Sequence, residues 1–273
     1  NIMLDISYFI SISYKKKEMR NIMIKKITTY ITPFQLERTL HIALPDNYYE
    51  TQVHYPVMYM YDGHNLFQDH DATYGKSWGL EDFLNDYDKP FIIVGIECNH
   101  EGQERLNEFS PYTFDNSYFG HINGKGEILM DWVIEELKPF IDEHYRTIPF
   151  RECTGIGGSS MGGLMALYTV IKYNIYFSKA ACLSSAISMC MPQLKNELQE
   201  AFIDSDTRVY MSFGTKEVRG KKGIELMKNN LNEIEKQFYL RGASFHLNII
   251  KNGQHNEASW EKENKVYFDY LWK

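Results

Sequence analysis

The alternation of short apolar runs with amphipathic segments is the feature that most constrains the fold of this chain. Residues 55–61 and 90–98 are almost continuously apolar, which is typical of strands buried on both faces of a sheet. Amphipathic segments with helical periodicity lie between such runs, the longest at 126–145 and 223–242. Strands that alternate with helices predict an α/β fold, in which a mostly parallel central sheet carries helices on both faces.

The other expected elements continue this pattern. Residues 22–31 and 36–45 alternate apolar and polar side chains, so we expect two antiparallel strands that give the sheet a mixed edge. We expect the remaining strands at 153–158, 179–187, 207–214 and 244–252, and the remaining helices at 77–87, 161–173, 192–203 and 257–272.

Length and composition favour one globular domain. The 273 residues include 44% apolar and 15% aromatic residues, which is enough for a sizeable core. Neither an internal repeat nor a Pro/Gly/Ser-rich linker divides the chain, so we expect a single domain over 21–273 after a poorly ordered extension over 1–20. The irregular stretch 98–125 is long for a compact domain, and such loops are usually functional or mobile.

Charge and cysteine usage restrict the partners. The formal charge of -7 is spread along the chain without a basic stripe, which argues against nucleic acid and favours a small-molecule substrate. The four cysteines lie far apart with no CxxC pair, as expected of reduced thiols. No stretch approaches the roughly 18 apolar residues of a membrane span, and the order of charge and apolarity in 1–20 is wrong for a signal peptide. We expect a cytoplasmic protein without a membrane partner, and the sequence leaves open whether it forms a homo-oligomer.

A glycine-rich segment, GIGGSSMGG at 155–163, joins a predicted strand to a predicted helix. A dinucleotide fingerprint would need glycine where Ser160 stands, and a phosphate loop would need lysine where Leu164 stands. The spacing of Gly158, Ser160 and Gly162 instead matches G-x-S-x-G, the turn that exposes a nucleophilic serine between a strand and a helix. The segment therefore predicts that Ser160 is a nucleophile.

A serine nucleophile needs a general base and a carboxylate that orients it. His255 follows the last predicted strand and Glu217 follows the strand before it, so both should project from the sheet edge that carries Ser160. The order Ser160, Glu217, His255 is that of the α/β-hydrolases. Weaker candidates for the carboxylate are Glu257, Asp204 and Asp206.

Two backbone amides should stabilise the oxyanion that forms during the attack. One is the N–H of Met161, which follows the nucleophile, and the other should come from a loop after an early strand. Gly63 permits an unusual backbone angle in such a loop and would aim the N–H of His64 or Asn65 at the acyl oxygen.

Five segments together resemble the Putative esterase family of the α/β-hydrolases, which includes feruloyl, acetylxylan and enterochelin-type esterases, S-formylglutathione hydrolase and mycolyltransferases. The segments are YPVMYMYDGHNLF, RLNEFSP, GIGGSSMGGLMALY, SFGTKE and GQHNEASW. The resemblance implies a carboxylic ester hydrolase in which Ser160 attacks, His255 relays the proton and Glu217 orients the histidine, with no metal or cofactor. The family's acid is often Asp, so Glu217 is a departure. Arg105, Asn107 and Glu108 match a recurrent loop of the family, where they would contact substrate or hold the loop together.

Several alternatives stay open on the sequence. The same triad would serve an acyltransferase, and a hydrolase-like fold can persist as a non-catalytic binding protein. A possible metal site is the cluster of Asp62, His64, Asp69, His70 and Asp71, but its spacing fits neither a zinc motif nor a calcium loop. Short or aromatic acyl groups are the expected substrates, because the 56 residues between Ser160 and Glu217 show no lid insertion. Trp78, Tyr112 and Phe114 would line the pocket or belong to the core.

Overall fold

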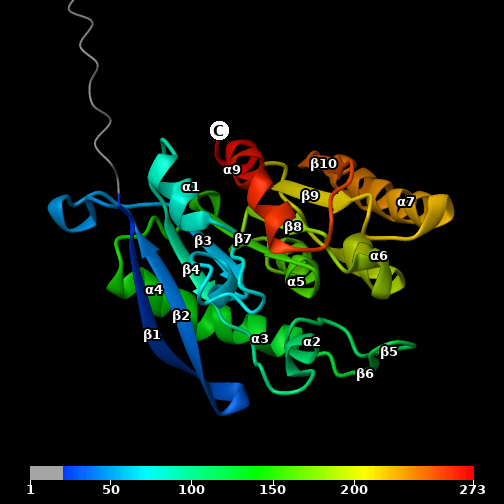
Figure 1. Ribbon diagram of the computed structural model, residues 1–273, viewed down its shortest axis with the longest axis horizontal. Helices are drawn as coiled ribbons and strands as arrows, with labels where there is room; N and C mark the ends of the chain where they lie inside the picture. The colour runs from blue at the N-terminus through cyan, green and yellow to red at the C-terminus, as the bar shows by residue number, and fades with distance from the viewer. Residues whose placement is uncertain (1–20) are drawn as a thin grey trace, which may run out of the picture.

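The computed structural model describes residues 21–273 and contains an eight-stranded sheet (Figure 1). The extension expected over 1–20 lies outside the described residues. The strands of the main sheet are β1 (Met23–Ile31), β2 (Leu36–Leu44), β3 (Val57–Tyr61), β4 (Ile92–Ile96), β7 (Thr154–Ser159), β8 (Lys179–Leu183), β9 (Arg208–Gly214) and β10 (Ser244–Ile250). A separate hairpin consists of β5 (Phe114–Asn116) and β6 (Gly120–Ile122).

Helices connect these strands in the expected alternation. They are α1 (Leu80–Asp86), α2 (Glu104–Glu108), α3 (Gly126–Trp132), α4 (Lys138–His144), α5 (Met161–Lys172), α6 (Met191–Glu200), α7 (Gly220–Tyr239), α8 (Glu257–Trp260) and α9 (Asn264–Trp272).

The sheet has the order β1-β2-β4-β3-β7-β8-β9-β10. Strands β4, β3, β7, β8, β9 and β10 are parallel to one another, whereas β2 is antiparallel to both β1 and β4. The predicted mostly parallel sheet and its mixed edge are therefore confirmed. Because the parallel strands all end at one edge, the loops after β3, β4, β7, β9 and β10 meet there.

Two layers of helices cover the sheet. Alternate residues of β3 show the division: Tyr59 and Tyr61 belong to the core beneath α3 to α7, and Met58 and Met60 belong to the core beneath α1, α8 and α9. Figure 1 shows α1 and α9 on one side of the sheet and α3, α4 and α5 on the other. Both faces of the central strands are buried, which explains their nearly continuous apolar sequence.

The structure corrects four details of the expected elements. The helix predicted over 126–145 contains a π-helical turn at Val133–Leu137, just before Pro139, which has no N–H to donate to a regular helix. The stretch 98–125 is not irregular throughout, since it holds α2 and the β5–β6 hairpin. The strand expected over 179–187 ends at Leu183, and the last predicted helix is divided into α8 and α9 by a 3₁₀ turn.

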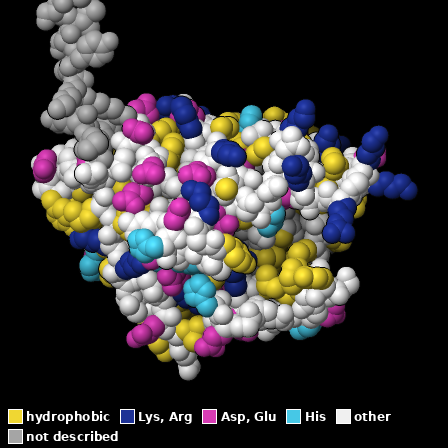
Figure 2. Space-filling model, viewed as in Figure 1, with side chains coloured by type: hydrophobic (Ala, Val, Ile, Leu, Met, Phe, Trp, Pro, Cys, Tyr) yellow, Lys and Arg dark blue, Asp and Glu magenta, His cyan; other side chains and the backbone are white. Residues whose placement is uncertain are grey.

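Surface charge is uneven across the molecule. In Figure 2, acidic and basic side chains are mixed over much of the visible face, whereas Lys and Arg side chains gather over α7. Among the helices of residues 21–273, none is both long enough and apolar enough to cross a membrane.

Candidate active site

Ser160 lies in the sharp turn between β7 and α5. Its backbone angles are φ 57° and ψ -120°, a strained combination for a residue with a side chain. The turn is tight because a Cβ added at Gly158 would lie 2.7 Å from the carbonyl carbon of Gly162. A Cβ at Gly162 would in turn approach that of Tyr61 to 3.0 Å. The strand-turn-helix geometry expected of the G-x-S-x-G motif is therefore present, and both glycines have a steric reason.

His255 and Glu217 are joined by a hydrogen bond. His255 lies between β10 and α8, and its Nδ1 is 2.9 Å from Oε2 of Glu217. The other carboxylate oxygen, Oε1, accepts hydrogen bonds from the Ser184 hydroxyl at 2.7 Å and from the N–H of Gly214 at 2.6 Å. The Glu217 side chain is only 6% exposed, whereas that of His255 is 45% exposed. Glu217 is thus a buried acceptor at Nδ1 of His255, so a role of this histidine as a base would fall to Nε2.

The weaker candidates for the acid lie in other surroundings. Asp206 forms an ion pair with Arg151. The backbone N–H of Asp204 donates a hydrogen bond to the side-chain oxygen of Asn174. Glu257 lines the same cavity as His255, and burial raises the pKa of its carboxyl group. Only Glu217 among these four carboxylates is hydrogen-bonded to His255 in the described chain.

Two residues behind the acid did not emerge from the sequence. The Ser184 hydroxyl that donates to Glu217 also accepts a hydrogen bond from Nε1 of Trp260 at 2.8 Å. The Trp260 ring packs edge-on against the His255 ring, with centroids 5.4 Å apart. The backbone of Ser184 is in the left-handed region, with a φ of 46°, which is uncommon for a residue other than glycine. A serine after a strand and a tryptophan in a helix carry no sequence signal for this arrangement, since their partners lie far away in the chain.

A cavity of about 520 Å³ opens beside these residues, within the size range of small-molecule sites. Its wall includes Ser160, His255, Trp260, His64, Cys98 and Arg105. Ser160 and His255 therefore face one space, although residues 21–273 show no hydrogen bond between their side chains. Such contacts are often long before substrate binds.

The two expected oxyanion donors also lie at this edge. Met161 is the first residue of α5, so its N–H has no acceptor within that helix. In the 3₁₀ turn Gly63–Asn65, the N–H of Asn65 donates to the carbonyl of Asp62 at 2.8 Å. The N–H of Asn65 already has an acceptor. The N–H of His64, a residue that lines the cavity, is therefore the remaining candidate for the second oxyanion donor in that loop.

The predicted substrate loop divides into two parts. Arg105 lines the cavity and binds Asp62 through two hydrogen bonds of 2.7 Å. Burial raises the pKa of Asp62, but the charge and hydrogen bonds of Arg105 outweigh it and hold that pKa below its ordinary value. Glu108 is buried in a two-pronged ion pair with Arg38, and Asn107 accepts a hydrogen bond from the N–H of Asn123. Arg105 can contact substrate, whereas Glu108 and Asn107 hold the loop together.

The acidic residues of the 62–71 segment do not converge. Asp62 binds Arg105, Asp69 accepts hydrogen bonds from Ser77, and Asp71 pairs with Lys26. None of the three aromatic residues considered as pocket walls lines the cavity. Trp78 is buried among the apolar residues beneath α1 and α9, and Tyr112 and Phe114 pack against the opposite core.

Comparisons with known proteins identify the family of this chain. The model of the family described as Putative esterase matches residues 32–266. The Bacillus subtilis protein YbbA is 26% identical over 195 residues, which cover 69% of this chain and 72% of YbbA. Esterase Rv1288 of Mycobacterium tuberculosis is 30% identical over 154 residues, which are 55% of this chain but only 29% of that longer protein.

Solved structures share the fold at low sequence identity. The enterobactin esterase FES of Shigella flexneri superposes with a TM-score of 0.71 at 18% identity, covering 92% of this chain and 59% of FES. A ferulic acid esterase gives 0.66 at 16% identity and covers 92% and 97% of the two chains. The fold class is therefore that of the α/β-hydrolases, as predicted. With the family match extending over most of its length, this chain belongs to the Putative esterase family and is a carboxylic ester hydrolase.

Proposed function

We propose that the protein hydrolyses esters of short or aromatic carboxylic acids through an acyl-enzyme on Ser160. The observation that carries this proposal is the hydrogen bond from His255 to the buried Glu217 carboxylate, beside a cavity that Ser160 also lines. A non-catalytic relative would have no chemical need for a strained serine, an oriented imidazole and a buried acid at one sheet edge.

Each of the three residues has a defined role in the proposed reaction. Nε2 of His255 removes the proton of the Ser160 hydroxyl while Oγ bonds to the acyl carbon. The carbonyl oxygen becomes an oxyanion, which accepts hydrogen bonds from the N–H groups of Met161 and His64. His255 then gives its proton to the departing alkoxide. A water molecule, activated by the same imidazole, releases the acid and restores Ser160.

The expectation of a short or aromatic acyl group is supported by the cavity and its surroundings. The span between Ser160 and Glu217 holds α5, β8, α6 and β9, without an inserted lid. A cavity of about 520 Å³ suits a compact acyl group better than a long chain. Among the similar structures, one is named a ferulic acid esterase, and that name points to an ester of an aromatic acid.

Labelling with a small fluorophosphonate tests the nucleophile directly. The reagent reacts with activated serines and demands little acyl specificity, so the adduct can be located by mass spectrometry. We expect one adduct on Ser160, and we expect His255→Ala to abolish it because the hydroxyl then has no base. Ser185→Ala, which alters a nearby buried serine, is the matched control and should keep the label on Ser160.

Hydrolysis of p-nitrophenyl acetate and of an aromatic ester completes the test. Ser160→Ala should remove turnover of both esters while leaving the far-UV circular dichroism unchanged. An adduct at another residue, or full labelling of the His255→Ala variant, would refute the proposed triad.

A further inference from the structure

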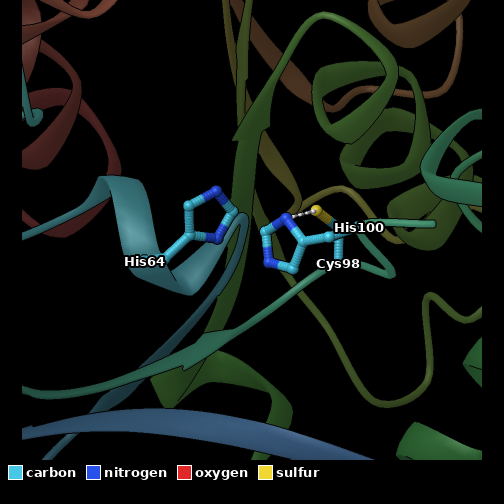
Figure 3. Close-up of side chains that lie close together, drawn as sticks. All are labelled: His64, Cys98 and His100. Atoms are coloured by element: carbon cyan, nitrogen blue, oxygen red, sulfur yellow. Dashed lines mark hydrogen bonds between the residues drawn. The ribbon is translucent and has the colours of Figure 1, made fainter. Parts of the chain in front are cut away.

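Three potential metal ligands meet in the wall of the cavity. His64 comes from the turn after β3, and Cys98 and His100 come from the loop after β4. One ring nitrogen from each histidine and the Cys98 sulfur all lie within 4.8 Å of one another. Figure 3 shows the two imidazole rings next to each other, with Nδ1 of His100 joined to the Cys98 thiol at 3.9 Å. Of the Asp and His residues clustered within 62–71, only His64 belongs to this set.

His64 carries a buried ring nitrogen that has no partner. The residue is 6% exposed, and its Nδ1 lacks a hydrogen bond within the described chain. An unpaired polar atom at such a position is rare in folded proteins, and a bound ion can supply the missing interaction. A neutral imidazole nitrogen is also the form that binds a metal.

The second ring nitrogen of His64 is held by a hydrogen bond, as in metal-bound histidines, and that of His100 lies near a carboxylate. Nε2 of His64 is 2.9 Å from the hydroxyl of Thr73. Nε2 of His100 lies 3.9 Å from Oε2 of Glu97, whose other oxygen is 2.7 Å from Nε2 of His41. A carboxylate or hydroxyl on the outer nitrogen fixes the ring so that the inner nitrogen faces the ion.

From this arrangement we propose that His64, Cys98 and His100 form a binding site for a thiophilic divalent cation such as Zn²⁺. Two imidazoles and a thiolate are three of the four ligands of a tetrahedral zinc site, and the fourth position would face the cavity. Ligand atoms around Zn²⁺ are about 3.5 Å apart, so the set must contract by roughly an ångström. The exposed His100 side chain has the freedom to make this movement. When the metal–sulfur bond forms, the thiol releases its proton to solvent.

The charges around the site are compatible with a cation. Asp62 and Glu97 are the nearby acids, and the positive charge of Arg105 is already neutralised by Asp62. Because His64, Cys98 and His100 line the same cavity as Ser160 and His255, a bound ion would occupy the wall against which the acyl group lies. On the proposed function, metal binding and ester hydrolysis therefore exclude each other.

Cobalt provides a readout that is independent of hydrolysis. We expect Co²⁺ added to the reduced protein to give a thiolate-to-cobalt charge-transfer band and the visible bands of a tetrahedral site, with one equivalent bound and displaced by Zn²⁺. Cys98→Ser should remove the charge-transfer band, and His100→Gln should weaken binding at least tenfold. The matched controls are Cys153→Ser and His121→Gln, neither of which lines the cavity, and both should bind as the wild type does.

Each outcome decides the proposal. Absence of the bands, or their persistence in Cys98→Ser, would overturn the site. If Co²⁺ binds as described but Zn²⁺ leaves hydrolysis unchanged, the proposed exclusion between metal and substrate is wrong. If these bands appear but the fluorophosphonate labels a residue other than Ser160, the proposed triad is refuted and the metal site remains supported.

Discussion

At the scale of single residues, the acid of the candidate triad is defined by its hydrogen bonds. Glu217 accepts from Ser184, from the N–H of Gly214 and from His255, so both carboxylate oxygens are engaged. The sequence suggested Glu217 through chain order and its position after a predicted strand, and left Glu257, Asp204 and Asp206 as weaker alternatives. The contacts with Ser184 could not be foreseen, because they depend on how the loops after β8 and β9 approach each other.

Replacing Glu217 by Gln is expected to lower kcat by about 10³-fold to 10⁴-fold while the fold is retained. An amide can donate to Nδ1 of His255, which selects the wrong tautomer and removes the charge that stabilises the imidazolium. Steady-state hydrolysis of an activated ester measures the effect. Glu225→Gln, on the exposed face of α7, is the control and should keep wild-type activity. A loss of less than tenfold in Glu217→Gln would show that another carboxylate serves the histidine.

At the scale of elements, the turn from β7 to α5 decides where Ser160, the proposed nucleophile, lies. Ser160 has a positive φ in a turn so tight that the backbone segments on either side of it come into contact at Gly158 and Gly162. Glycine at these two positions avoids a steric clash. These requirements are local, and for that reason the motif could be interpreted from the sequence. The π-helical turn before α4 was not foreseen, since amphipathic periodicity continues through it.

A pair of glycine substitutions tests the steric argument. Gly158→Ala should lower the free energy of unfolding by about 1–3 kcal/mol, because the new Cβ would lie 2.7 Å from backbone atoms that cannot move away. Gly223→Ala in α7 should instead raise it by about 0.5–1 kcal/mol, since its Cβ meets only ordinary contacts. Chemical denaturation of both variants measures the difference. Equal effects of the two substitutions would contradict the close approach in the turn.

At the scale of the whole molecule, one buried acid makes stability depend on pH. Glu263 is buried beneath the sheet and accepts a hydrogen bond from the Tyr210 hydroxyl at 2.6 Å. Burial raises the pKa of its carboxyl from 4.5 to about 7, against the opposing effect of that hydrogen bond. The fold therefore favours the protonated acid. The stability that this preference contributes is complete below about pH 4.5 and is lost as the pH rises through 7.

Glu263→Gln removes the titration while keeping the side-chain shape. We expect the variant to match the wild type near pH 4.5 and to exceed it at pH 8 by on the order of 3 kcal/mol in the free energy of unfolding. Urea denaturation at both pH values measures the difference, with the exposed Glu225→Gln as control. A variant that is less stable than the wild type at pH 8 would show that the ionised carboxylate is stabilised in the fold.

The order of strands and helices, the serine turn and the chain order of Ser160, Glu217 and His255 follow from the sequence by itself. They depend on side-chain periodicity and on steric demands within a few neighbouring residues, both of which are written locally in a chain. The tertiary structure alone decided which groups meet across the sheet edge. It placed Trp260 behind Ser184, paired Arg105 with Asp62, and brought His64 beside Cys98 and His100. These contacts join residues distant in the chain, and only the packing of parallel strands with their loops at one edge brings them together.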